Sequence, residues 1–162
     1  MAVGGLTGFT GPSWRGVAAG REAAVLDGTA RAGRYNRPGE PTLYMSGSPD
    51  GVAAAMARYG EAPRSLIQLW VEAAPLLDLR DPAASTLLGI DAATAQADWQ
   101  AALRRGEEPP SWSVVDRARA AGAVGLIDPS RHAPDLWHLV LFRWNGAGGA
   151  RVAVRPAMHP DF

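Results

Sequence analysis

The segment from Arg34 to Met56 constrains the fold most, because it predicts a loop, a short strand and a helix in immediate succession. Glycine and proline punctuate residues 28–40, a loop composition, and residues 42–45 are typical of a strand. Ser48 is a helix N-cap candidate, since a proline and an acidic residue follow it directly. We expect this helix to extend to residue 59, with a glycine after it.

The rest of the chain predicts about six strands and three or four short helices, without internal repeats. This mixture indicates a single α+β domain over residues 1–162, with a mixed β-sheet core and short flanking helices. Residues 1–11 are rich in glycine and threonine, and we expect them to be loosely ordered. Strands are expected near residues 14–18, 64–72, 75–79, 124–127, 135–144 and 151–154, and further helices near 92–105 and 112–121, with Asp81 and Asp91 as cap candidates.

Composition excludes several classes of function. The chain has 162 residues, and its 16 basic residues, all arginine, balance 16 acidic residues, which favours neither nucleic-acid nor membrane-surface binding. With no lysine and no cysteine, Schiff-base chemistry and thiol nucleophiles are excluded. The sequence shows neither a secretory signal nor a membrane helix, so we expect a cytoplasmic protein.

A few polar residues are candidates for a site. Arg34 has the planar fork that can bind two phosphate oxygens at once, although a loop arginine in solvent is the alternative. Tyr44 is either a packing aromatic or the aromatic face of the site, and Ser46 could contact a ligand. Ser130 follows a strand, where a serine either faces a cleft or stabilises a turn.

The three histidines do not have the spacing of a metal site, so we expect no metal. His138 lies within an apolar run and is expected to be a packed core residue. The sequence has neither a glycine-rich nucleotide-binding turn nor a nucleophile elbow. This argues against dinucleotide binding of the Rossmann type, a nucleoside triphosphatase and a serine hydrolase.

Taken together, these residues resemble the RES domain, a family of bacterial toxins named after an arginine, a glutamate and a serine. The resemblance covers about residues 13–145. It rests on four blocks: Trp14-Arg15, Gly33-Arg34-Tyr35-Asn36 with Pro38-Gly39, Leu43-Tyr44-Met45-Ser46 with Ser48-Pro49, and Gly125-Leu126-Ile127 with Pro129-Ser130.

The resemblance implies a fold similar to ADP-ribosyltransferases, NAD+ as the substrate, and a cognate antitoxin that covers the active-site cleft. It assigns Arg34, Tyr44 and Ser130 to the family's arginine, tyrosine and serine, with Arg15 and Ser46 as further ligand contacts. The family glutamate would fall at position 55, and this chain has Ala55 there. A homodimer within a larger complex is compatible with the sequence.

Alanine at position 55 removes the group that the reaction needs most. Cleavage of the nicotinamide–ribose bond builds positive charge on the ribose, which a carboxylate stabilises. An engineered inactivation of a toxic chain, a natural loss and a shifted alignment are the explanations, and we favour the first. Sequencing the native gene tests it, because any codon other than glutamate at Ala55 contradicts that explanation.

The sequence therefore predicts an NAD+-consuming toxin that transfers ADP-ribose to water, phosphate or a protein acceptor, weakened in this chain by Ala55. A mono-ADP-ribosyltransferase with one protein target is a variant of this prediction. A catalytically silent module that binds NAD+ or a partner is the first alternative. A small structural domain with a chance motif is the second, and separation of Arg34, Tyr44 and Ala55 on different surfaces would favour it.

Overall fold

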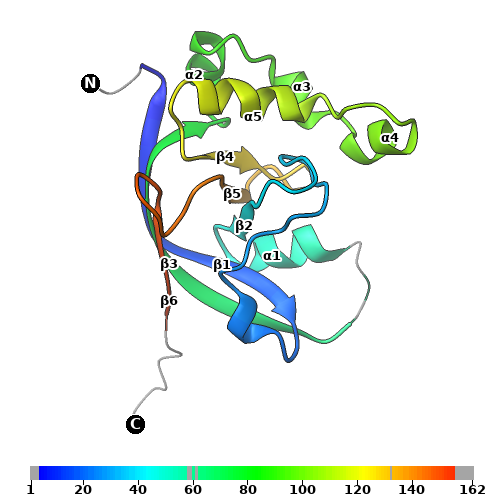
Figure 1. The fold of residues 1–162 in the computed structure, drawn as a ribbon, viewed down its shortest axis with the longest axis vertical. Helices are drawn as coiled ribbons and strands as arrows, with labels where there is room; N and C mark the ends of the chain where they lie inside the picture. The colour runs from blue at the N-terminus through cyan, green and yellow to red at the C-terminus, as the bar shows by residue number, and fades with distance from the viewer. Residues whose placement is uncertain (1–3, 58–59, 61, 132, 156–162) are drawn as a thin grey trace.

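The computed structural model describes residues 4–57, 60, 62–131 and 133–155. Six strands and a set of short helices alternate along this part of the chain (Figure 1). The strands are β1 (Leu6–Ala18), β2 (Leu43–Ser46), β3 (Arg64–Asp78), β4 (Gly125–Pro129), β5 (Trp137–Leu141) and β6 (Arg151–Val154). The helices are the 3-10 turn η1 (Glu22–Ala24), α1 (Pro49–Met56), α2 (Pro82–Leu87), α3 (Ala92–Gln96), α4 (Trp99–Arg104) and α5 (Ser111–Ala120).

The strands form one mixed sheet in the order β1-β2-β5-β4-β3-β6. A long antiparallel pairing of β1 with β3 joins the two sides of this order, so five strands form a closed ring and β6 extends it from β3. The β3–β4 pairing is parallel, and the other pairings are antiparallel. The expected α+β class with a mixed sheet and short helices is confirmed.

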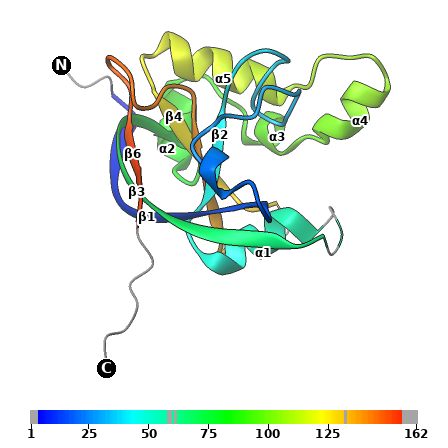
Figure 2. The same cartoon turned by 60° about the horizontal axis from the view of Figure 1, so that its bottom comes forward.

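Two apolar clusters lie on opposite faces of β2, β5 and β4. One fills the space between these strands and the β1–β3–β6 ribbon. The other lies beneath α2, α3 and α5 and is built from alternate residues of the same strands, as strand pleating requires. Figures 1 and 2 show α2–α5 gathered on one side of the molecule, with α1 apart from them beside β1. Within the described part of the chain, no helix is long and apolar enough to cross a membrane.

The N-terminal segment differs from the prediction. From Leu6 onward it belongs to β1 and pairs with β3 as far as Leu6↔Leu77. Residues 6–11 are therefore ordered, because pairing with β3, irregular only between Thr7 and Phe9, outweighs their glycine-rich composition. Residues 1–3 lie outside the described residues.

The helix boundaries confirm some predictions and correct others. Ser48 caps α1 by accepting a hydrogen bond from the Gly51 N–H at 3.0 Å, and Asp81 and Asp91 cap the next two α-helices. α1 ends at Met56, whereas the predicted end at residue 59 lies outside the described residues. The single helix predicted over 92–105 is two helices, because Asp98 caps α4 through the Ala101 N–H at 3.0 Å.

Candidate functional site

A row of polar side chains crosses the helix-facing side of the sheet. Ser46 on β2 pairs with His138 on β5, and His138 pairs with Asp128 on β4. Directly paired residues project from the same face of a sheet, so these three side chains lie on one face. The side chains of Tyr44, Val140 and Leu126, two positions along each strand, lie on that same face. The Ser46 Oγ lies 2.9 Å from the His138 Nδ1. The polar row is thus the point where the apolar layer beneath the helices ends.

Arg34 lies against this row and is held on two sides. Its Nη1 donates to the Asp128 Oδ2 at 3.1 Å. Its Nε and Nη2 both donate to the carbonyl oxygen of Ala95 in α3, at 3.1 and 2.7 Å. The Tyr35 hydroxyl donates to the other Asp128 oxygen at 2.8 Å. One buried carboxylate therefore fixes two consecutive residues of the loop.

The loop that carries Arg34 is anchored to β2 through Tyr44. The Tyr44 hydroxyl accepts a hydrogen bond from the Tyr35 N–H at 3.0 Å and donates to the Asn36 Oδ1 at 2.7 Å. Gly33 begins this turn, and a Cβ there would lie 2.5 Å from the Asn36 Oδ1 and 2.9 Å from the Tyr44 hydroxyl oxygen. Only glycine leaves room for these two groups to meet.

The first turn of α5 holds the same loop from the other side. The Trp112 indole donates to the Gly33 carbonyl oxygen at 2.8 Å, and the Ser111 hydroxyl donates to the Arg34 carbonyl oxygen. Arg37 closes the outer edge through ion pairs with Glu108 and Asp116. The backbone around Arg34 is therefore fixed before any ligand binds.

Burial sets the electrostatics of the cluster. Asp128 is 2% exposed. Desolvation raises its pKa to about 6, although the Arg34 charge and the Tyr35 hydrogen bond both favour the ionised form. Burial also raises the pKa of Tyr35 and lowers that of His138, and the Arg34 charge lowers the His138 pKa further. At neutral pH the cluster thus contains one cation, one anion and a neutral imidazole.

The structure brings together most of the residues that the sequence singled out. Arg34, Tyr44 and Ser46 lie around the polar row. Ser130 is buried and directly follows β4, two positions beyond Asp128. Its N–H donates to the Leu136 carbonyl oxygen at 2.8 Å, so this backbone also stabilises the turn before β5.

Ala55 reaches the same region from α1, which packs against β1 and β2. A Cβ on Gly51 would lie 3.0 Å from the Ser46 Cβ, so this face of the helix turns toward the polar row. Ala55 is one helical turn further along and therefore lies on the same face. The expected position of the glutamate thus lies on the face of α1 that begins beside Ser46.

Arg15 is the exception. Trp14 pairs with Ser46, so the adjacent Arg15 projects from the opposite face of β1. Its guanidinium donates to the carbonyl oxygens of Val25 and Asp27, and burial lowers its pKa. The structure therefore places Arg15 apart from the polar row, because neighbouring residues of a strand project from opposite faces.

Sequence reasoning missed Asp128 and Tyr35, and it expected His138 only as a packed residue. The available signal for Asp128 was a single acidic residue that ends an apolar strand, two positions before Ser130. His138 is half-buried rather than fully enclosed. Strand pairing brings it beside Ser46 and Asp128, which its position in the sequence does not reveal.

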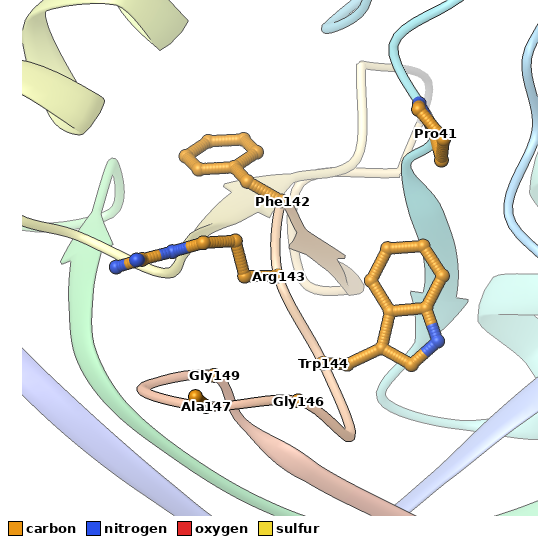
Figure 3. A pocket seen from close by; sticks show the side chains of 7 residues that line it. All are labelled: Pro41, Phe142, Arg143, Trp144, Gly146, Ala147 and Gly149. Atoms are coloured by element: carbon orange, nitrogen blue, oxygen red, sulfur yellow. The ribbon is translucent and has the colours of Figure 1, made fainter.

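Two surface pockets lie elsewhere. The first has a volume of about 340 Å³ at the opposite end of β2 and β5 (Figure 3), where the rings of Pro41, Phe142 and Trp144 surround it. The second, of similar volume, opens beside β1 and includes Glu72 and Arg151. Neither contains Arg34. We place the site at the polar row because the buried charges and the pKa shift are there. In the described part of the chain, histidine and acidic side chains do not gather in the groups of three that a metal ion requires.

The mixed sheet and its short helices define a domain of the α+β class, with a buried arginine–carboxylate cluster on the helix-facing side. Within this class, the RES domain model matches residues 10–162, and the chain belongs to the RES-domain family. The fold is also similar to that of a chain in the crystal structure of the M. tuberculosis MbcT–MbcA toxin–antitoxin complex. The TM-score is 0.57 and the identity 19%, with 93% of this chain and 87% of that chain covered. No curated protein matches the sequence significantly.

Proposed function

We propose that this chain is the toxin of a bacterial type II toxin–antitoxin pair and that its polar row binds NAD+ in the cytosol. The observation that carries the proposal is the placement of Arg34. Its three hydrogen bonds use three of the five guanidinium N–H groups, so one N–H remains on each terminal nitrogen. Among the described residues, these two groups have no partner, and a fork of this kind fits the oxygens of a diphosphate.

The proposed reaction breaks the bond between the ribose C1′ and the nicotinamide nitrogen. The bonding electron pair leaves with nicotinamide, the ribose carbon develops positive charge, and an acceptor oxygen forms the new bond to C1′. With water as the acceptor, the products are ADP-ribose, nicotinamide and a proton. Phosphate or a protein side chain can replace water. Tyr44, which holds the Arg34 loop, and Ser130, which follows β4, are the candidates for contact with the ribose.

Position 55 decides whether this chain performs the reaction. A carboxylate at position 55 would lie on the face of α1 that begins beside Ser46 and could stabilise a cationic ribose, whereas Ala55 cannot. Loss of one preorganised electrostatic group typically costs about 10²–10³ in rate. This chain is therefore proposed to be a weakened form of the enzyme that retains the binding site.

The partner follows from the same comparison. The similar solved structure is a toxin–antitoxin complex. We propose that a cognate antitoxin covers the Arg34 side of this chain, since an enzyme that drains NAD+ must be restrained in its own cell. A pull-down of the antitoxin with an Arg34→Glu variant tests this, and undiminished capture by the variant counts against it.

The test of the enzymatic proposal compares Ala55→Glu with the isosteric but uncharged Ala55→Gln. Both variants are incubated with NAD+ in the presence of water alone, phosphate or a bacterial lysate, and nicotinamide release is followed by mass spectrometry. We expect Ala55→Glu to release nicotinamide about 10²-fold faster or more than Ala55→Gln. The mass of the ADP-ribosyl product identifies the acceptor. Equal, negligible release by both variants under all conditions contradicts the proposal.

The second candidate function is a silent binding module, which Ala55 itself favours. Its signature is NAD+ binding by the unchanged chain, without nicotinamide release from either variant. Native alanine at position 55 in the gene would support it further.

A further inference from the structure

Asp128 is a buried acid whose oxygens both serve the loop that carries Arg34. Oδ2 accepts from the Arg34 Nη1 and Oδ1 accepts from the Tyr35 hydroxyl. Tyr35 is itself 1% exposed, so its hydroxyl has no access to water as a substitute partner. Each oxygen of the carboxylate is thus engaged by one of two adjacent residues, which favours a structural role over attack on a substrate.

Stability alone does not explain an ionised group at this position. Burying an ion pair costs desolvation free energy that the Coulomb attraction often fails to offset, and apolar replacements of similar size are frequently neutral or better. The raised pKa of Asp128 shows that desolvation outweighs Arg34 here. The orientation that Asp128 imposes on Arg34 and Tyr35 therefore explains its burial better than stability does.

Asp128 and the Ala95 carbonyl group together fix the orientation of the Arg34 guanidinium. The Ala95 carbonyl oxygen lies 3.1 Å from the Arg34 Nε and 2.7 Å from Nη2, and Asp128 holds Nη1 at 3.1 Å. Contacts on both terminal nitrogens prevent rotation of the planar group about its last bonds. The Arg34 Cζ also lies 5.2 Å from the centroid of the Tyr35 ring, which the same carboxylate holds. The unused N–H groups therefore point in a fixed direction.

We propose that Asp128 is a positioning residue for substrate binding: together with the Ala95 carbonyl, it orients the Arg34 guanidinium so that its free N–H groups meet the diphosphate of a dinucleotide. The role rests on the function proposed above only for the identity of the ligand. The orientation of Arg34 by Asp128 is a property of the free chain and is measurable without NAD+.

The first variant is Asp128→Asn. Its amide oxygen still accepts from Tyr35, whereas the charge is lost and an amide group confronts the Arg34 Nη1. We expect NAD+ to bind about tenfold more weakly by calorimetry. Glu107→Gln is the control, because it removes the carboxylate from another arginine pair, Arg105–Glu107, whose Glu107 side chain is 59% exposed and does not contact the Arg34 loop. The control is expected to bind NAD+ as the unchanged chain does.

The pH profile separates positioning from a general loss of structure. Protonation of Asp128 removes the anion that holds Arg34, so the NAD+ affinity of the unchanged chain is expected to fall as the pH drops from 8 through about 6. Tyr35 does not titrate in this range, because burial raises its pKa. Burial lowers the pKa of His138, and protonation of its ring would add positive charge and strengthen binding of a diphosphate. Asp128→Asn is expected to lack the fall.

Nuclear magnetic resonance of the Arg34 side chain gives the readout that is independent of NAD+. The Nε–H signal is expected to be sharp and slowly exchanging in the unchanged chain, and broadened or fast-exchanging in Asp128→Asn. If Asp128→Asn does not fold, Asp128→Glu keeps the charge but displaces the carboxylate by one methylene, and the same loss of Arg34 order is expected.

The outcomes are distinguishable. An ordered Arg34 in the position-128 variants, or unchanged NAD+ affinity with an unchanged pH profile, overturns the positioning role. Absence of NAD+ binding by the unchanged chain, with Arg34 ordered only when Asp128 is present, contradicts the proposed ligand and supports the positioning role.

Discussion

The hydroxyl of Tyr44 donates a 2.7 Å hydrogen bond to the Oδ1 of Asn36, and this contact ties the loop that carries Arg34 to strand β2. The same hydroxyl accepts from the Tyr35 N–H at 3.0 Å. Asn36 is buried, and its amide group donates to the carbonyl oxygens of Arg31 and Arg37. Tyr44 therefore acts first on the backbone next to Arg34, whatever contact it makes with a ligand.

Replacing Tyr44 with phenylalanine is expected to lower the free energy of unfolding by about 1–3 kcal/mol, because the Asn36 Oδ1 and the Tyr35 N–H lose their partner in a site with little water. Urea denaturation measures the change. Ser113→Ala is the control, because it removes an exposed hydroxyl contact on α5 and is expected to change stability little. Equal effects of both substitutions would show that the Tyr44 hydroxyl does not hold the loop.

Gly33→Ala is expected to disrupt the loop far more than an alanine at another loop glycine. The new methyl would approach the Asn36 Oδ1 to 2.5 Å, and neither Asn36 nor Tyr44 can move without breaking its hydrogen bonds. Gly146→Ala is the control, because its nearest neighbour would be the Trp144 carbonyl oxygen at 4.0 Å. We expect a lower melting temperature and loss of NAD+ binding for Gly33→Ala only. Two variants with the same melting temperature would contradict the packing described here.

Arg34 and Asp128 are expected to be energetically coupled. Arg34→Ala leaves a buried carboxylate without its cation, which typically costs about 3–5 kcal/mol at a pH where the acid is ionised. In an Asp128→Asn background the same substitution is expected to cost much less. A double-mutant cycle at pH 8 measures this coupling, and additive effects would mean that the ion pair has no influence on stability.

The raised pKa of Asp128 predicts a specific pH dependence of stability. In the unfolded chain an aspartate ionises near pH 3.9, whereas folded Asp128 does so at about 6. Between these values the folded state binds more protons, so Asp128 makes the free energy of unfolding fall by about 2 kcal/mol as the pH rises from 4 to 6. Asp128→Asn is expected to abolish that contribution. Denaturation curves of both chains across this range test it, and parallel pH profiles would refute it.

Local signals in the sequence were sufficient for much of the fold. Ser48 and Asp81 predicted the starts of their helices correctly, because an N-cap side chain bonds a backbone N–H within three residues of itself. The same locality explains the errors: residues 6–11 are ordered by a partner strand about sixty positions away, and Asp98 divides a helix that side-chain periodicity alone had joined.

The site was only partly predictable for a related reason. Arg34, Tyr44 and Ser46 belong to one continuous segment, so their grouping followed from chain order. Asp128 and His138 join them through the register of β2, β5 and β4, which no local pattern specifies. Arg15 lies apart from them because neighbouring residues of a strand face opposite sides, and Trp14 occupies the side toward Ser46.

The most direct test of the central claim is a calorimetric titration of the chain with NAD+, compared with Arg34→Lys and Arg31→Lys. Both substitutions keep the charge and remove the planar fork, but Arg31 is an exposed residue of the same loop. We predict that Arg34→Lys weakens NAD+ binding by about tenfold or more, equivalent to about 1.4 kcal/mol, while Arg31→Lys leaves it unchanged. Equal affinity of all three chains for NAD+ would contradict the account.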